Sequence, residues 1–436
     1  MLLRRFWTTC RSLSSYMREN SGTVVVIPTR NRAAIAMNAI RSLLDQNVER
    51  LSIMVSDNST SETERKVLEE FCARCADARL SYVSPPESLS MPAHWDWAIQ
   101  EALQNYQASH FLYLTDRMMF RKGELGEIFD LAAQNPDKVI SYNHDRIIDN
   151  LEPIRVEQNF VTEKLYDVST LQLSRLTAQA GLIHPAMPRM LNCIVPRTVL
   201  ERIRDRFGSV FSSVSPDFNF CCRCLEIEES ILYYDKSLIF HYAQSRSNGA
   251  SVTRRELTAD NQDFNANLSV ESSKTNFATP IPGLITAVNY AFHEYCLFKQ
   301  ETNSPKFFEL DIQNYLQANA NEIPEIIDPQ LKAETLSLLK ANGYSEKQTD
   351  MVRSAPPNSF SHRLLSKIER VLSGPSTTAV WMFLARNFPV TPPSYNFFEF
   401  ASLDQAIDYA RNISRGNFSR RRGSQELLNA RELSKR

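Results

Sequence analysis

A continuous run of apolar and β-branched residues at positions 23–27, TVVVI, most restricts how this chain can fold. A strand with one face in water alternates apolar and polar side chains, and this run has no such alternation. The run therefore predicts a strand that is buried on both faces. Strands of that kind are typical of parallel sheets that carry helices on both sides.

Strand patterns and helix patterns alternate after this run. Further strands are predicted at residues 51–55, 80–83, 111–115 and 139–142, and helices at residues 31–46, 61–75, 93–103 and 123–133. The alternation predicts an α/β fold of the Rossmann-like type, with a mostly parallel sheet and helices on both faces. Ligands of such sheets bind at the carboxyl ends of the strands.

Three polar clusters fall at predicted strand ends, and we expect them to converge in space. The clusters are Pro28-Thr29-Arg30-Asn31, Asp57-Asn58-Ser59 and Asp116-Arg117. A fixed carboxylate at a strand end can accept two hydrogen bonds from a nucleoside. The residues of the second cluster also suit a turn and a helix cap, so both interpretations of Asp57 stay open.

The charge balance and the hydropathy limit the classes of partner. The 436 residues include 49 basic and 50 acidic side chains, whereas a general nucleic-acid binder carries a basic field. No nucleic-acid partner is therefore expected. No run reaches the roughly 18 apolar residues that span a bilayer, so no transmembrane segment is predicted.

The eight cysteines favour a reducing, cytoplasmic protein, since a chain of this size needs no disulfides. A peripheral membrane association is compatible with this location. Together, the groups Cys72/Cys75 and Cys221/Cys222/Cys224 have the residue type that binds zinc. Buried free thiols are the favoured interpretation, because the two groups lack the usual paired CxxC…CxxC layout.

The segments VVVIPTRNRAAIAMNAIRSLLDQ, at residues 24–46, and LSIMVSDNST, at residues 51–60, resemble the opening of family-2 glycosyltransferases with the A-type (nucleotide-diphospho-sugar transferase) fold. The resemblance runs through residues 22–255. It implies transfer of a sugar, with inversion, from a nucleotide-diphosphate donor to a glycan, a lipid-linked glycan or a protein. It also implies that Pro28, Thr29, Arg30 and Asp57, with Asn58 beside it, hold the nucleoside of the donor.

Asp116 falls where the resembling family carries an Asp-x-Asp motif that ligates Mg²⁺ or Mn²⁺, but here Arg117 follows it. Hard cations prefer several oxygen ligands, and a single carboxylate is a weaker site. One hypothesis is a divalent metal ion on Asp116, with His241 completing the shell as a late histidine does in some relatives. The other is that Arg117 itself neutralises the phosphates. We favour metal on Asp116, assisted by Arg117.

Two further residues are assigned roles by the resemblance. Asp217, beside Pro216 at a predicted helix start, matches the acid that acts as the base in inverting relatives, although this pair is also a simple N-terminal helix signature. His94 opens the predicted helix in LSMPAHWDWAI (residues 89–99), near the expected donor sugar. A packing role for the neighbouring Trp95 and Trp97 is the alternative there.

Four regions are expected along the chain. Residues 1–21 are interpreted as a basic arm in preference to a transit peptide, 22–255 as the nucleotide-sugar-binding and catalytic domain, 256–414 as a helical C-terminal region and 415–436 as a basic polar tail. Helical patterns lie at residues 280–298, 330–342, 362–372 and 402–413, and around Trp381. The helical region is the expected place of acceptor or partner binding and of a homodimer contact.

Two rival functions share these features. A nucleotidyltransferase has the same strand and helix order, but it usually carries a glycine-rich loop after its first strand, and residues 28–34 contain no glycine. A non-catalytic nucleotide-sugar-binding module is supported by the missing second acid at Arg117. Release of a nucleoside diphosphate from a candidate donor distinguishes an enzyme from such a module.

Overall fold

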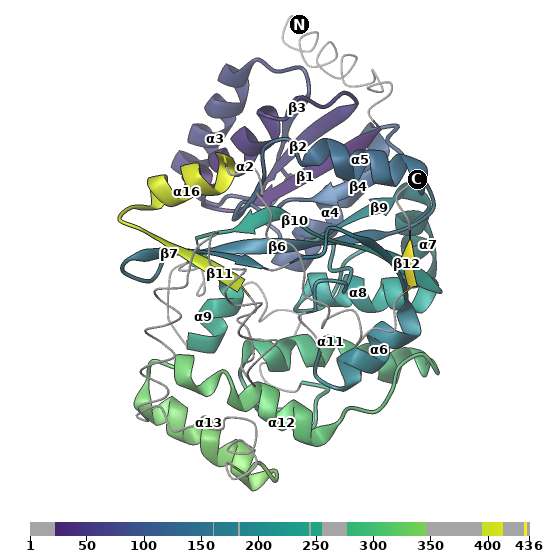
Figure 1. Cartoon of the computed structure of the whole chain (residues 1–436), viewed down its shortest axis with the longest axis vertical. Coiled ribbons are helices and arrows are strands. Elements are labelled where there is room, and N and C mark those ends of the chain that lie inside the picture. Colours follow the sequence, from purple (N-terminus) through teal and green to yellow (C-terminus); the bar gives the residue numbers. More distant parts are fainter. Residues whose placement is uncertain are drawn as a thin grey trace, which may run out of the picture.

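The computed structural model describes residues 22–159, 161–181, 184–243, 246–254, 277–345, 395–412 and 431–433. These residues form one central sheet with helices on both faces (Figure 1). Its strands are β1 (Thr23–Thr29), β2 (Leu51–Asp57), β3 (Leu80–Val83), β4 (His110–Tyr113), β5 (Met118–Phe120), β6 (Ile140–Ile148), β7 (Ile154–Asn159), β8 (Leu165–Ser169), β9 (Cys193–Pro196), β10 (Ser230–His241), β11 (Tyr395–Phe400) and β12 (Arg431–Leu433).

The strand order across the sheet is β12-β8-β10-β6-β9-β4-β1-β2-β3. The half that the sequence predicted is parallel, because β1 pairs in parallel with both β2 and β4, and β2 with β3. β9 is antiparallel to β4 and β6, while β6 and β10 are again parallel. The predicted fold class, a mostly parallel α/β sheet of the A type, is confirmed.

The helices are α2 (Ala33–Leu44), α3 (Glu62–Cys75), α4 (Met91–Asn105), α5 (Leu125–Gln134), α6 (Thr170–Ala178), α7 (Arg197–Phe207), α8 (Pro216–Ile227), α9 (Asn248–Arg254), α11 (Ala287–Thr302), α12 (Ile312–Ala320), α13 (Pro329–Ala341) and α16 (Leu403–Asn412), with a short 3-10 turn η2 (Ile323–Glu325). None of the described helices is long and apolar enough to cross a lipid bilayer. The helices predicted at residues 362–372 and around Trp381 lie outside the described residues.

Strand β1 is completely buried, as its unbroken apolar run predicts. Val24 and Val26 pack into one core cluster with residues of α4 and α8. Val25 and Ile27 point to the other face and pack with residues of α2, α3 and α5. Successive side chains of a strand face opposite sides, so each face of this strand needs its own apolar layer.

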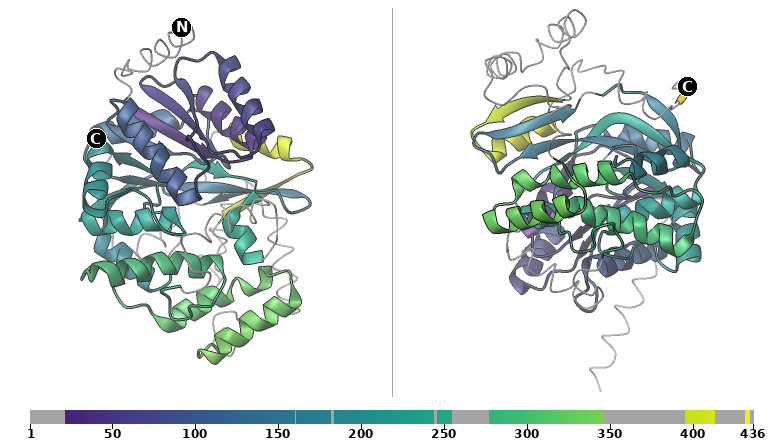
Figure 2. Two further views of the ribbon diagram at one scale, coloured as in Figure 1. Left: turned by 180° about the vertical axis from the view of Figure 1, so that it is seen from behind. Right: turned by 90° about the horizontal axis from the view of Figure 1, so that it is seen from below.

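The C-terminal helices α11, α12 and α13 lie on the opposite side of the sheet from α2 and α3 (Figures 1 and 2). They share an apolar cluster that includes Phe292, Tyr315 and Leu339. Strand β11 pairs antiparallel with β7, and Arg411 of α16 pairs with Asp45 after α2. Residues 395–412 therefore return to the main sheet, whereas the domain boundaries proposed from the sequence stay predictions.

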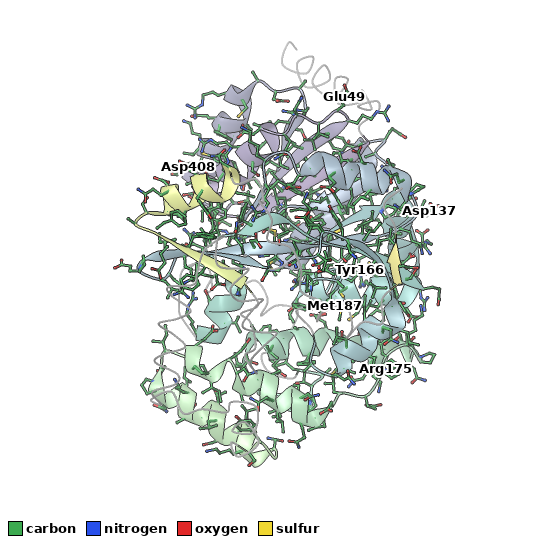
Figure 3. The ribbon with its side chains drawn as sticks, viewed as in Figure 1. Glu49, Asp137, Tyr166, Arg175, Met187 and Asp408 are labelled. Atoms are coloured by element: carbon green, nitrogen blue, oxygen red, sulfur yellow. The ribbon has the colours of Figure 1, made fainter. Side chains whose placement is uncertain are left out.

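The largest core cluster lies between the sheet and helices α4, α6, α7 and α8. Tyr166 and Met187 belong to it and are labelled in Figure 3, whereas Glu49, Asp137 and Asp408 lie at the periphery. Cys221, Cys222 and Cys224 are buried there as free thiols. Burial raises the pKa of each of these thiols, so they stay protonated and pack as small apolar groups.

Candidate active site

A cavity of about 320 Å³ opens at the carboxyl ends of β1, β2 and β4. The described residues that line it come from eight separate parts of the chain: Pro28, Thr29, Arg30, Arg32, Asn58, Leu89, Met91, His94, Trp95, Thr115, Asp116, Arg117, Leu191, Val214, Ser215, Asp217, Phe218, Ser247, Asn248, Gly249, Val252, Ala287 and Tyr290. Members of all three polar clusters meet here, as expected for strand ends of a parallel sheet.

Most of the site residues expected from the sequence line this cavity. They are Pro28, Thr29, Arg30, Asn58, His94, Asp116, Arg117 and Asp217. Asp57 and His241 do not line it. The position of a residue at the cavity does not test its role, so these roles stay predictions.

Asp57 is fully buried at the end of β2 and is held by its own chain. One carboxylate oxygen accepts the hydroxyl of Tyr82 at 2.9 Å, and the other accepts the N–H of Ser59 at 2.8 Å. Asn58 bonds both the N–H and the carbonyl of Leu89, at 3.0 and 2.8 Å. Asp57 thus shapes the turn, and Asn58 fixes the loop that leads into α4.

Replacement of Asp57 is expected to weaken the fold. Asp57→Ala leaves the hydroxyl of Tyr82 and the N–H of Ser59 without their acceptor, which we expect to lower the free energy of unfolding by about 1–3 kcal/mol. Urea denaturation measures this change. Tyr82→Phe is the matched control, because it removes one of the two contacts and should cost less.

The nucleotide role of Asp57 is tested separately. Calorimetric affinity of folded Asp57→Ala for a nucleoside diphosphate should fall if Asp57 contacts the nucleoside. An affinity equal to that of the wild type would mean that Asp57 shapes the turn and does not contact the nucleoside.

His94 lies in the first turn of α4 and is buried. Its Nε2 is 2.8 Å from the hydroxyl of Ser56, and its ring stacks on Trp97. Burial, aided by the nearby charge of Arg30, lowers the pKa of His94 to about 3. His94 is therefore neutral at physiological pH and offers this wall of the cavity a hydrogen-bonding group without a charge.

Asp116 is buried and already has partners within the chain. Its Oδ2 accepts the hydroxyl of Thr29 at 2.9 Å and lies 3.0 Å from Nε of Arg32. Arg32 also donates to the carbonyl of Arg246 at 3.1 Å. Arg32 was missed by the sequence analysis, although the arginines of PTRNR, two residues apart after β1, were a visible signal.

Arg117 has the opposite surroundings. Its guanidinium lines the cavity and has no hydrogen bond or ion pair with any residue that the structure describes. Burial, followed by repulsion from Arg32, lowers the pKa of Arg117 to about 10. The group is still charged at neutral pH, so the cavity presents a desolvated cation whose charge is not matched by a contacting carboxylate.

The metal site expected from the sequence is not assembled by the described residues. No group of three His, Cys, Asp or Glu side chains gathers among them. The carboxylate of Asp116 holds Arg32, and Arg117 adds a second cation beside it. The ring of His241 is tilted against that of His144, with 4.3 Å between the ring centroids, and His241 lies outside the cavity lining. These residues do not fit a bound divalent ion, because two positive side chains occupy its surroundings.

Asp217 enters the cavity from the first turn of α8. Burial raises the pKa of its carboxyl, although Arg189 and the N–H groups at the start of the helix oppose the shift. A carboxylate with a raised pKa is a stronger proton acceptor than an exposed one. This is the property required of a general base.

Much of the remaining cavity wall is apolar. Leu191, Val214 and Phe218 lie beside Asp217, while α9 and α11 add Val252, Ala287 and Tyr290. Ser247, Asn248 and Gly249, at the start of α9, also line the cavity. The cavity thus has a cationic end at the strands and an apolar end at the C-terminal helices.

Comparison with known proteins finds a family match for one segment of the chain. Residues 24–190 match the model of "Glycosyl transferase family 2". Among curated proteins, none matches this sequence.

Several solved structures have a similar shape at low identity. A Staphylococcus aureus TarS structure is 14% identical, with a TM-score of 0.38, over 74% of this chain and 53% of that one, so this chain spans about half of it. TarS 1–349 in complex with UDP-GlcNAc is 14% identical, with a TM-score of 0.41, over 75% of this chain and 92% of that one. Mannosyltransferase PcManGT from Pyrobaculum calidifontis, in complex with GDP-Man and Mn²⁺, is 13% identical, with a TM-score of 0.40, over 84% of this chain and 90% of that one.

At these scores the likeness by itself says nothing of donor, acceptor or metal. The family match rests on the segment that supplies β1, β2, β4 and the polar clusters at their ends. Residues 24–190 of this chain therefore match glycosyl transferase family 2, which confirms the resemblance of the sequence.

Proposed function

We propose that the chain is an inverting glycosyltransferase that takes a sugar from a nucleotide-diphosphate donor. The observation that carries the proposal is one cavity with two chemically distinct ends. Its cationic end belongs to the family 2 domain and suits a diphosphate, and Asp217, a carboxyl with a raised pKa, faces the same space. The acceptor is a hydroxyl of a glycan, a lipid-linked glycan or a protein.

The proposed reaction is a single displacement. The carboxylate of Asp217 takes the proton of the acceptor hydroxyl as its oxygen attacks the anomeric carbon of the donor sugar. The bond from that carbon to the diphosphate breaks, and its electron pair leaves on the diphosphate oxygen. The proton ends on Asp217. Attack opposite to the leaving group inverts the anomeric centre.

Arginines are proposed to neutralise the departing diphosphate. Arg117 lines the cavity with an unpaired guanidinium, and Arg30 and Arg32 lie at the same end. A guanidinium is planar, always charged at neutral pH and suited to forked contacts with phosphate oxygens. Such preorganised charges stabilise a leaving group without any rearrangement during the reaction. This assignment selects the second of the two hypotheses for residues 116–117.

A non-catalytic binding module is the second candidate, favoured by the ion pair that engages Asp116. A panel of sugar nucleotides, screened first by thermal shift and then for release of nucleoside diphosphate with mixed acceptors, tests the proposal. Stabilisation by one donor together with release of its nucleoside diphosphate supports the enzyme. Stabilisation without release under any acceptor would support the module.

The rate should depend on pH through Asp217. A base must be deprotonated, so kcat/KM is expected to fall as the pH is lowered through the raised pKa of this carboxyl. The fall should begin at a higher pH than for an exposed aspartate, whose pKa is about 3.9. The pH dependence of kcat/KM is measured from initial rates across the acidic range. A rate that is flat down to the range of an exposed aspartate would argue against Asp217 as the base.

A further inference from the structure

We infer that Glu294, on helix α11 of the C-terminal region, is a positioning residue for Asp217. The inference rests on the proposed function and adds to it a specific task for the C-terminal helices. Glu294 does not line the cavity, so it acts through the backbone and side chains that carry the base.

Glu294 is fully buried and holds the first turn of α8 on both sides of Asp217. Its Oε1 accepts the N–H of Ser215 at 2.8 Å, two residues before Asp217. Its Oε2 accepts the side-chain amide of Asn219 at 3.3 Å, two residues after Asp217. One carboxyl group therefore fixes both neighbours of the proposed base.

The segment that leads into this turn is fixed by other side chains. Asp96 of α4 accepts the N–H groups of Val210 and Phe211 at 2.6 and 3.0 Å. Arg223 of α8 donates to the carbonyl of Ser209 and to the hydroxyl of Ser212, both at 2.6 Å. Ser212 in turn donates its hydroxyl to Oδ1 of Asn219 at 3.1 Å. Ser215 has no such contact from this segment, and its N–H is held by Glu294.

The ionisation of Glu294 is coupled to the same turn. Burial raises the pKa of Glu294 to about 8, and repulsion from Asp217 adds to the shift, while the N–H of Ser215 and the side chains of Ser213 and Asn219 oppose it. Cys222 and Arg223 also face this carboxyl; burial keeps the thiol protonated. Glu294 therefore stays protonated below this range and ionises as the pH rises through about 8.

The ionisation of Glu294 has two expected consequences. Above about pH 8 the ionised Glu294 binds the N–H of Ser215 more tightly and places a negative charge near Asp217, which makes Asp217 a stronger base. The wild-type kcat should therefore rise again through this range. The unfolded chain loses the same proton near its ordinary pKa, so folding stability from this group is present at low pH and declines as the pH rises toward 8.

Two variants test the inference. Glu294→Ala removes both contacts and should lower kcat by roughly tenfold or more, with the KM of the donor unchanged, because small displacements of a reacting group are costly. Glu294→Gln keeps an acceptor for the N–H of Ser215 but cannot ionise. It should fold, should lose the rise in kcat near pH 8 and should lose the decline of stability between acidic pH and pH 8. Glu322→Gln is the matched control, since Glu322 accepts the N–H of Val288 on the same helix.

The outcomes are distinct. A wild-type kcat and an unchanged pH profile in Glu294→Gln, together with wild-type stability at both pH values, would overturn the inference even if Glu294→Ala failed to fold. If the wild-type chain transfers no sugar from any donor, the proposed function fails and this role fails with it. Full transfer by both the wild type and Glu294→Ala would contradict the role of Glu294 and leave the proposed function standing.

Discussion

Asp217→Asn is expected to bind the donor as the wild type does and to transfer sugar roughly 100-fold more slowly or worse, which is the usual scale for a lost general base. Asparagine has nearly the same shape, so the first turn of α8 and its bonds to Glu294 should persist. It cannot take the proton of the acceptor hydroxyl. Calorimetry with a non-transferring donor and initial rates of nucleoside diphosphate release measure the two effects.

Asp205→Asn is the control for this change, because Asp205 is an exposed acid near the end of α7, outside the cavity lining. It should leave both affinity and rate unchanged. A normal rate of transfer in Asp217→Asn would return Asp217 to the role of a helix N-terminal acid, and the base would have to be sought elsewhere on the cavity wall.

Arg117→Ala should raise the barrier to transfer by on the order of 3 kcal/mol, comparable to the loss of one oxyanion donor. The leaving diphosphate then lacks the guanidinium that lines the cavity without a partner of its own. Affinity for the free nucleoside diphosphate should fall as well. Arg117→Lys should recover part of the activity, since an ammonium supplies charge but not the forked contact.

The same substitution should not destabilise the protein. Arg117 is a desolvated cation near Arg32, and its lowered pKa reports a cost of keeping it charged. Arg117→Ala removes that cost and breaks no described contact, so its resistance to urea should equal or exceed that of the wild type. Loss of activity with retained stability is typical of residues kept for function.

A chelator distinguishes the two hypotheses for this end of the cavity. If arginines neutralise the diphosphate, transfer should continue in EDTA, and Arg204→Ala, a change at an exposed arginine on α7, should be silent. The metal hypothesis would be supported instead if EDTA abolished activity, Asp116→Ala had the same effect and Arg117→Ala did not.

The apolar end of the cavity bears on the acceptor. Ala287 and Tyr290 of α11 form part of this wall, so the C-terminal region contributes directly to the cavity that Asp217 lines. Acceptor binding by this region, and a homodimer through its helices, stay predictions.

Much of the fold was readable from local sequence. The unbroken run at residues 23–27 required burial on two faces, and β1 has an apolar layer on each side. Strand and helix patterns placed the parallel half of the sheet, and the topology of such a sheet brings the polar residues after β1, β2 and β4 to one edge. These features follow from periodicity and chain direction, which are properties of short segments.

The chemistry of the cavity was decided by tertiary structure. Arg32 meets Asp116, and Glu294 meets Ser215, across long stretches of chain that no local pattern connects. Burial makes His94 neutral and raises the pKa of Asp217, because a low-dielectric surrounding disfavours the charged form of each. The sequence determined which residues reach the strand ends. Which of them are paired, charged or free to bind a ligand depends on the distances and the desolvation that only the folded chain establishes.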